Sequence, residues 1–334
     1  MKKLARMLKT GVILAGMAAA AGSASAQTVL KASHQFPGGK GDIRDEMVQV
    51  IAREVEAANV GLTVQVFPGS SLFKPNEQWN ALTRGLLEMT SFPLDYASGR
   101  HPEFSVTLMP GLVGNFDRAN RLNQSEFMQD IKKIIEDNGA IVIADAWLSG
   151  AFASKKTCIT SPETMKGQVI RAAGPAFEEM LAAAGASIAS MPSSEIYTGM
   201  QTGVLDAANT SSASFVSYRL FEQAKCLTAP GENALWFMYE PVLFSKQVFE
   251  RLTPEQQAAV LEAGKKAEAY FDAEVRKGDQ LMIDTYKKAG VEVVEMSKED
   301  YDAWLAVAKE SAYKNFAAKV PNGGALIEKA LAVE

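Results

Sequence analysis

Apolar residues along the chain recur in two patterns, alternation and helical spacing, which predict strands and helices in regular succession. In the first half, short apolar or alternating runs bounded by turn residues predict strands. These strands lie at residues 29–33, 62–67, 87–92 and 140–146. Amphipathic stretches between them predict helices at about 43–55, 76–84 and 117–136. Because strands that alternate with helices favour parallel pairing, this half is expected to form an α/β domain.

A second strand–helix run occupies residues 148–235, and the stretch 165–208 is its most informative part. There a strand ends on Arg171, a helix begins at a Gly-Pro pair, and the strand–helix order then repeats. An apolar, aromatic strand follows at 236–244 and is interrupted by Pro241. These elements predict a second α/β unit.

A long helix is predicted near the end of the chain. It begins at Thr253-Pro254-Glu255-Gln256, a capping-box start with proline at the first helical position, and continues to residue 289. A strand at 291–295 and a capped helix from Ser297 follow. Since the long helix exceeds the usual length within a domain, we expect it to bridge two domains.

The first 26 residues have the three parts of a secretory signal peptide. A basic start precedes an apolar run at 11–21, and small residues then lead to a cleavage site before Gln27. The apolar run is shorter than the roughly 20 residues that span a bilayer. The mature protein is therefore expected to be exported.

Charge and composition narrow the possible partners. Removing the signal peptide takes away four cations and no acid, which changes the formal net charge from −5 to −9. An acidic chain without a basic tract argues against nucleic acid or an anionic membrane surface as partner. The remaining length is long for one core and suits two domains.

The chain has two cysteines, Cys158 and Cys226, both in the mature part. An oxidising compartment allows a disulfide between them. The sequence does not supply the distance between their Cα atoms, so a bridge and two buried free thiols both remain open.

The motifs of catalysis and cofactor binding are not found. Nucleophilic catalysis usually needs a histidine beside the nucleophile, but the chain has only His34 and His101 and lacks the G-x-S-x-G elbow. The common zinc and calcium motifs are also missing, and the glycines at 38–41 lack the Walker spacing. We therefore expect a binding protein without a metal or a cofactor rather than an enzyme.

Arg171 is the first candidate binding residue. It ends a predicted strand, and open α/β sheets bind ligands at the carboxyl ends of their strands. A guanidinium there offers a planar, permanently charged fork for a carboxylate, although a surface salt bridge is the ordinary alternative. The aromatic residues around Trp236 fit a pocket wall or a core, and the serines after Thr210 fit helix caps or ligand donors.

Three motifs resemble one family. They are K-G-x-x-I-R at 166–171, G-A-S at 185–187 and MPSSEIYTGMQTGVLDA at 191–207. With the early LKASHQFP and the later LTPEQQAAVLEAG, they closely resemble the substrate-binding proteins of tripartite ATP-independent periplasmic (TRAP) transporters, the DctP-type family. The resemblance implies a two-lobe periplasmic binding protein fold of class α/β, with lobes joined by crossing strands and a long helix. It implies capture of a small organic carboxylate and delivery to a permease made of a small and a large membrane subunit.

The resemblance also implies a division into lobes and a set of ligand contacts. Lobe I comprises residues 27–148 plus about 239–278, and lobe II comprises 149–238 plus about 279–334. The carboxylate-binding arginine of the family corresponds to Arg171. The remaining expected contacts are His34, Gln35, Ser193, Asn209, Thr210, Ser211, Trp236 and Tyr239.

Two departures from the family pattern affect the expected ligand. Some members have a second arginine about 20 residues before the first, where this chain has Ala151. A D-G-x-E pattern is frequent after the turn, where this chain has Asp206-Ala207-Ala208-Asn209. We expect a site with one clamp, for a ligand with one carboxylate and a partly polar or aromatic body. An exported enzyme acting on small organic acids and a sensor subunit are the alternative functions.

Overall fold

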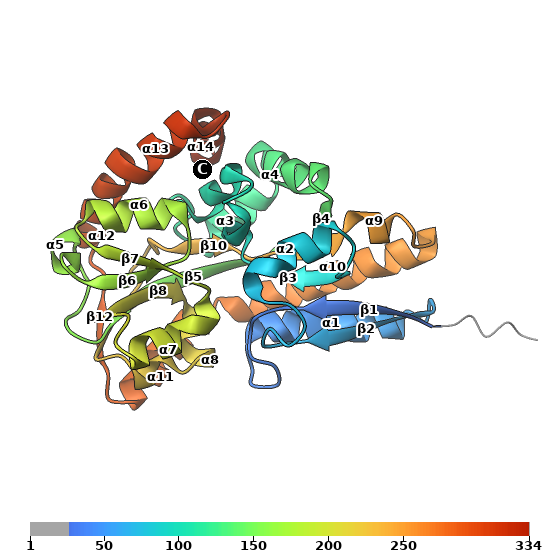
Figure 1. The fold of residues 1–334 in the computed structure, drawn as a ribbon, viewed down its shortest axis with the longest axis horizontal. Helices are drawn as coiled ribbons and strands as arrows, with labels where there is room; N and C mark the ends of the chain where they lie inside the picture. The colour runs from blue at the N-terminus through green and yellow to red at the C-terminus, as the bar shows by residue number, and fades with distance from the viewer. Residues whose placement is uncertain (1–26, 334) are drawn as a thin grey trace, which may run out of the picture.

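Two β-sheets organise the fold, and a computed structural model describes them for residues 27–333 (Figure 1). The predicted signal peptide and its cleavage site before Gln27 lie outside the described residues. The first sheet has the order β2-β1-β3-β11-β4, and the second has the order β12-β9-β5-β8-β6-β7, with β10 paired to β5. The first lobe is the five-stranded sheet with the segments that connect its strands, and the second lobe is the seven-stranded sheet with its connecting segments.

The first sheet contains the strands predicted in the first half of the chain and one strand from much later. Its β1 pairs in parallel with β2 and β3, as the alternation of strands and helices predicted. However, β11 lies between β3 and β4 and is antiparallel to both, so the sheet is mixed. The strands are β1 (Thr28–Ser33), β2 (Leu62–Phe67), β3 (Met89–Ser91), β4 (Ala140–Ala144) and β11 (Val242–Ser245).

The second sheet is also mixed. Here β6 is parallel to β7 and β8, whereas β5 is antiparallel to β8, β9 and β10. The parallel part, with β6 at its centre, comes from the most informative stretch of the sequence. The strands are β5 (Trp147–Ser154), β6 (Val169–Ala172), β7 (Ser187–Ser190), β8 (Ala207–Ser211), β9 (Cys226–Ala229), β10 (Phe237–Tyr239) and β12 (Glu292–Glu295).

Two of the segments that cross between the lobes are connections between strands. The strand predicted at 236–244 is in fact two strands in different sheets, because Pro241 has no N–H with which to continue a ladder. The other crossing lies between β4 and β5, and the Glu240 N–H donates to the Ala146 carbonyl at 2.8 Å, which ties the two crossings together. The sheets change at 145–146 and 240–241, near the predicted lobe boundaries of 148 and 239. The assignment of whole segments to lobes remains a prediction.

Two helices predicted as continuous are each divided. The helix from residue 254 ends at Val275 as α10 (Pro254–Val275), and α11 (Gly278–Lys288) follows. Glycine at the junction weakens the helix, and the two halves pack on different lobes: α10 on α1 (Ile43–Ala57) and α11 on α8 (Ser212–Ser217).

The helix predicted at 117–136 is likewise α3 (Phe116–Asn123) and α4 (Glu126–Asp137). Ser125 separates the two because its backbone is extended, at φ −87° and ψ 162°, and its hydroxyl caps α4 by accepting from the Met128 N–H. The other helices are α2 (Pro75–Thr83), α5 (Pro162–Met165), α6 (Pro175–Ala183), α7 (Ile196–Gln201) and α9 (Lys246–Phe249).

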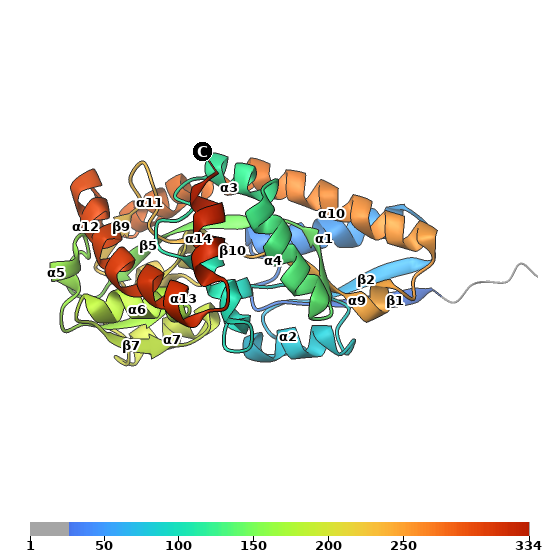
Figure 2. The ribbon, with the colours of Figure 1, turned by 90° about the horizontal axis from the view of Figure 1, so that it is seen from above.

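The C-terminal helices lie along both lobes. The segment formed by α12 (Lys298–Ala308), α13 (Lys314–Lys319) and α14 (Gly323–Leu331) extends from α6 of the second lobe to α4 of the first (Figures 1 and 2). Arg118 of α3 donates to the Ala330 carbonyl at 2.9 Å and to the Val333 carbonyl, which satisfies carbonyls at the end of α14. The end of the chain is therefore held against the first lobe.

Cys158 and Cys226 form a disulfide, with their Cα atoms 5.2 Å apart. The bridge attaches the loop after β5 to the start of β9. Among residues 27–333, these cysteines and Glu292 form the single group of three close residues of metal-binding type, and the disulfide removes both thiolates as ligands. None of the helices in this range combines the length and apolar character needed to cross a membrane.

Candidate ligand site between the lobes

Arg171 is held rigidly at the carboxyl end of β6. The strand is flanked by β7 and β8, so the side chain leaves the sheet where open α/β folds bind ligands. Its Nε donates to the Met191 carbonyl at 2.9 Å, its Nη1 to the Asn209 carbonyl at 2.9 Å, and its Nη2 to the Tyr96 hydroxyl at 3.0 Å. These neutral acceptors fix the plane of the guanidinium without balancing its charge.

Arg171 is only 1% exposed, yet it makes no ion pair with any of residues 27–333. A guanidinium has five N–H groups, and the three hydrogen bonds use one on each nitrogen. One N–H remains on each Nη, which is the pair that a carboxylate bonds in the bidentate arrangement. A buried charge without a partner is costly, so this arrangement suits an anion that enters from outside.

Tyr96 connects Arg171 to the first lobe. It lies on a 3-10 turn (Leu94–Ala97) that follows β3, and its hydroxyl is surrounded by three N–H groups. Besides Arg171, these belong to the Ser193 backbone at 2.9 Å and the Gln35 side chain at 3.3 Å. Because Arg171 and Ser193 belong to the second lobe, the Tyr96 hydroxyl joins the two lobes directly beside the anchor.

Buried polar groups without partners gather near the same place. Asn209 follows the β8 residue that is paired with Arg171, and it is fully buried with neither side-chain amide atom hydrogen-bonded. Gln35 Oε1 and Trp236 Nε1 are also buried and without a hydrogen-bond partner among residues 27–333. Because buried polar groups in proteins are nearly always satisfied, these atoms are the natural contacts of a polar ligand.

Strand alternation separates the predicted contacts on β8. Asn209 and Ser211 face the same side of the sheet, and Thr210 between them faces the other side. Ser211 is the N-cap of α8, accepting from the Ser214 N–H at 3.2 Å, and it also accepts from Arg44 Nη1 at 3.1 Å. Arg171 is paired with Ala208, so Thr210 shares its face of the sheet, and the contact of Thr210 with a ligand stays a prediction.

A second buried arginine, Arg44, lies across from β8 on α1. Its Nε and Nη2 donate to the two carboxylate oxygens of Asp42 at 2.9 and 2.7 Å. Its Nη1 faces Ser211, Ser214 at 3.0 Å and Glu240 Oε2 at 3.4 Å. Burial acts to raise the pKa of the Asp42 carboxyl, but the charge and hydrogen bonds of Arg44 outweigh it and lower the pKa. Arg44 thus has the carboxylate partner that Arg171 lacks.

The two residues at the end of β1 have different surroundings. His34 is fully buried, with Nε2 3.1 Å from Asp45 Oδ1, and Asp45 Oδ2 accepts from the Gly39 N–H at 3.0 Å. The contact with Asp45 ties His34 to the loop before α1, but His34 Nδ1 is buried without a hydrogen-bond partner among residues 27–333, so its contact with a ligand stays a prediction. Gln35 points to Tyr96, and its carbonyl accepts from the Tyr218 hydroxyl of the second lobe at 3.0 Å. The structure thus brings Gln35 to the Arg171 group.

The two aromatic candidates also differ. Trp236 packs on β5 at Gly150, where a Cβ would lie 2.4 Å from the indole, so only glycine allows this contact. The Tyr239 hydroxyl instead donates to Asp145, and its ring packs on Trp147 with centroids 4.8 Å apart. The contacts of Tyr239 are therefore with a hydrophobic core and not with the Arg171 group.

Two of the cavities between the lobes lie near the buried arginines. One of about 310 Å³ is lined by Tyr96 and Met191, which both hydrogen-bond the Arg171 guanidinium, although Arg171 itself does not line it. Asp95 and Gly174 also line this cavity, and burial raises the pKa of the Asp95 carboxyl to about 7.

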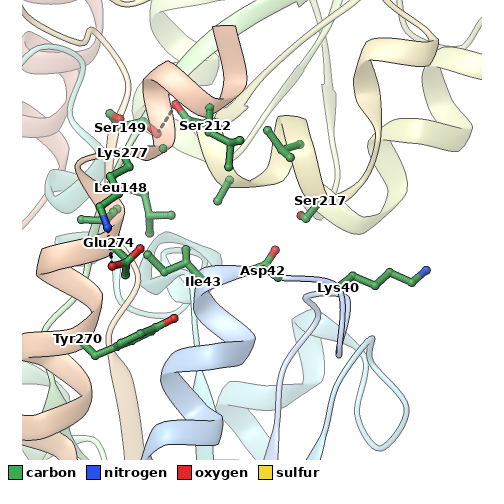
Figure 3. Close-up of a pocket in the computed structure, with 16 residues that line it drawn as sticks. Lys40, Asp42, Ile43, Leu148, Ser149, Ser212, Ser217, Tyr270, Glu274 and Lys277 are labelled. Carbon is green, nitrogen blue, oxygen red and sulfur yellow. Dashed lines mark hydrogen bonds and ion pairs between the residues drawn. The ribbon is translucent and has the colours of Figure 1, made fainter. Parts of the chain in front are cut away.

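The other cavity, of about 330 Å³, reaches Asp42 (Figure 3). Figure 3 shows Asp42 and Ile43 on one side of it, Ser212 and Ser217 opposite, and Tyr270 of α10 along the side. It approaches the paired arginine, Arg44, and not Arg171.

Three residues of this site were missed by the sequence reasoning. Tyr96 follows the end of a predicted strand, so the rule that singled out Arg171 also applies to it. Arg44 lies in the first turn of a helix, where the helix dipole disfavours a positive charge. This unusual position could have marked Arg44 as a residue with a specific partner. Glu240 lay within the predicted strand at 236–244 and carried no distinguishing pattern.

The fold and the cleft define a class: a two-lobe solute-binding protein with a buried arginine that lacks a carboxylate partner between the lobes. Residues 40–319 match the sequence model of DctP, bacterial extracellular solute-binding protein, family 7, and the chain belongs to this family. A "Solute-binding protein" of Albidiferax ferrireducens is 39% identical over 301 residues, 89% of each chain. The 2,3-diketo-L-gulonate-binding periplasmic protein YiaO of Escherichia coli is 26% identical over 272 residues, 80% of each chain.

Solved structures agree with this assignment. A TRAP periplasmic solute-binding protein from Rhodoferax ferrireducens with bound malonate has a TM-score of 0.88 and 38% identity, covering 90% of this chain and 96% of that one. A second, from Sulfurospirillum deleyianum with bound succinate, has a TM-score of 0.83 and 24% identity, covering 92% and 100%. The two-lobe α/β fold expected from the sequence is confirmed.

Proposed function

We propose that this protein captures a small organic carboxylate in the periplasm and delivers it to a TRAP permease. The ligand's carboxylate bonds the two remaining N–H groups of Arg171, on the floor of the cleft. The observation that carries the proposal is the burial of Arg171 without a carboxylate partner, beside Arg44, which has one. Malonate and succinate in the related solved structures support this ligand class.

The other contacts follow from the surrounding polar groups. The Asn209 amide and Gln35 Oε1 satisfy further polar atoms of the ligand, and the Trp236 indole N–H contacts its body. Ser193 contributes through Tyr96 rather than directly. Export follows cleavage before Gln27, and closure of the lobes produces the shape that the small and large permease subunits recognise.

Calorimetry on protein freed of endogenous ligand tests the proposal. Mass spectrometry of ligand released from native protein, with a thermal-shift screen of organic acids, first supplies a ligand. Arg171→Ala is then expected to lose about 2–5 kcal/mol of affinity, because a buried carboxylate is left without its cation. The exposed Arg219→Ala is the matched control and retains full affinity. Unchanged affinity in Arg171→Ala, or chemical turnover of the ligand, contradicts the proposal.

A further inference from the structure

The cleft holds two buried guanidiniums, and only one of them has an unbalanced charge. Arg44 is neutralised by the bidentate pair with Asp42, and it faces a second carboxylate, Glu240, at 3.4 Å. Arg171 has no carboxylate partner among residues 27–333. The cations and anions in this group therefore nearly balance before any ligand enters, which limits the negative charge that the cleft can accept.

Glu240 is a buried carboxylate whose charge is less well compensated than that of Asp42. It lies on the crossing between β10 and β11 and is 3% exposed. Its single side-chain hydrogen bond among the described residues is the long contact with Arg44, whose Nη1 also serves Ser211 and Ser214. Burial raises the pKa of the Glu240 carboxyl, and the charges of Arg44 and Arg171 act in the opposite direction.

Glu240 is linked indirectly to Arg171 through Arg44 and β8. Arg44 Nη1, which it contacts, bonds Ser211, and Ser211 faces the same side of β8 as Asn209. The Asn209 carbonyl in turn accepts from Arg171. A continuous series of contacts thus runs from the anchoring guanidinium to Glu240 through the residues expected to touch the ligand.

We infer that Glu240 restricts the Arg171 site to ligands that carry a single negative charge. The inference rests on the proposed function and deepens it. A first carboxylate is matched by Arg171. A second ionised carboxylate on the same ligand would be buried near Glu240, and the other guanidinium is already neutralised by Asp42. Repulsion of this kind between buried like charges is a common way to exclude a wrong ligand.

Matched ligand pairs test the inference on the unmodified protein. Malonate and malonamate, and succinate and succinamate, have nearly the same size but differ by one charge at pH 8. Calorimetry is expected to show each monoamide binding at least tenfold more tightly than its dicarboxylate. Malonate is a strict test, because the related Rhodoferax ferrireducens structure holds it. A dicarboxylate that binds as tightly as its monoamide, or more tightly, overturns the inference.

The isosteric variant Glu240→Gln tests the residue itself. Removing its charge is expected to shift the ratio of affinities at least tenfold in favour of the dicarboxylate. Glu268→Gln is the matched control, since Glu268 is also partly buried near the crossings but hydrogen-bonds the Asp145 N–H instead of Arg44. An unchanged ratio in Glu240→Gln, or an equal shift in both variants, overturns the inference. If Glu240→Gln does not fold, the affinities of the native protein for the matched ligand pairs still test the inference.

Arg171→Ala separates this inference from the proposed function. If Arg171→Ala binds neither member of a pair and the native protein prefers the dicarboxylate, the anchor stands. Only the restriction to singly charged ligands is then refuted. Retained binding of both members in Arg171→Ala refutes the anchor, and with it the proposed function.

Discussion

Arg44 and Arg171 are buried to the same extent in one cleft, each 1% exposed, but only Arg44 is paired with a carboxylate. Asp42 supplies that partner within the same lobe, whereas Arg171 bonds two carbonyls and the Tyr96 hydroxyl. The difference assigns different roles to chemically identical side chains. Arg44 completes the architecture of the cleft, and the charge of Arg171, which lacks a carboxylate partner, supports the ligand contact proposed for it.

The first prediction concerns stability without ligand. Arg44→Ala leaves the Asp42 carboxylate buried and unpaired, so the free energy of unfolding is expected to fall by about 3–5 kcal/mol. Arg171→Ala removes a charge that already lacks a partner, so the loss is expected to be clearly smaller. Urea denaturation of the ligand-free variants measures both. Equal losses would show that Arg171 is a structural cation like Arg44.

The second prediction concerns Tyr96. Tyr96→Phe removes the acceptor shared by Arg171 Nη2 and the Ser193 N–H, and with it a contact that joins the lobes. Ligand affinity is expected to fall by about 1–3 kcal/mol, mainly through faster dissociation, because two buried donors lose their partner. Small-angle scattering at saturating ligand is expected to show a less closed shape. The control Tyr197→Phe removes a hydroxyl that bonds exposed Glu222, and it changes neither measurement.

Much of the fold was predictable because its signals are local. Strand alternation, the Gly-Pro helix start before α6 and the capping box at Thr253 each depend on neighbouring residues. The pairing of β11 between β3 and β4 was not predictable, because it joins segments that are 151 (242 − 91) and 98 (242 − 144) residues apart. The break between α10 and α11 was missed for a related reason: the two helices pack on different lobes, and the sequence shows only one continuous apolar pattern.

The site was predictable only in part. Arg171 and Asn209 lie where the family pattern placed them, on neighbouring strands, although their contact with a ligand stays a prediction. Alternation along β8 already implied that Asn209 and Thr210 face opposite sides, and the contact of Thr210 with a ligand also stays a prediction. The contact of Tyr239 with Asp145 and that of Arg44 with Glu240 join distant segments, so single-sequence reasoning had no access to them.

The third prediction concerns the disulfide. Cys158 and Cys226 are separated by 68 residues, and a loop of this length restricts the unfolded chain strongly. Replacing both by serine is expected to lower the free energy of unfolding by about 2–4 kcal/mol. Urea titrations of the native protein with and without reductant, beside the double variant, measure the effect. A native protein whose unfolding midpoint is insensitive to full reduction would contradict it.

The fourth prediction concerns pH. Burial, opposed by the Ser98 hydrogen bond, raises the pKa of Asp95 from 3.8 to about 7. Between these values the unfolded chain releases a proton that the folded protein retains, so folding stability falls as pH rises from about 4 to 7. Asp95→Asn mimics the protonated form, and its advantage over the native protein is expected to grow to a few kcal/mol by pH 8. The melting temperatures of both proteins are measured from pH 5 to 8. A constant difference between them over this range would refute the raised pKa of Asp95.

The last prediction tests closure through sterics alone. Gly174 of the second lobe has an extended backbone, with φ 176°, which any residue adopts without strain. A Cβ there would nevertheless lie 1.6 Å from Asp95 Oδ2 of the first lobe. Gly174→Ala is therefore expected to fold normally but to prevent full closure, lowering ligand affinity at least tenfold while circular dichroism is unchanged. Gly324→Ala, where a Cβ meets open space, is the control and retains affinity. Full affinity in Gly174→Ala would mean that the ligand binds without the contact between Asp95 and the start of α6.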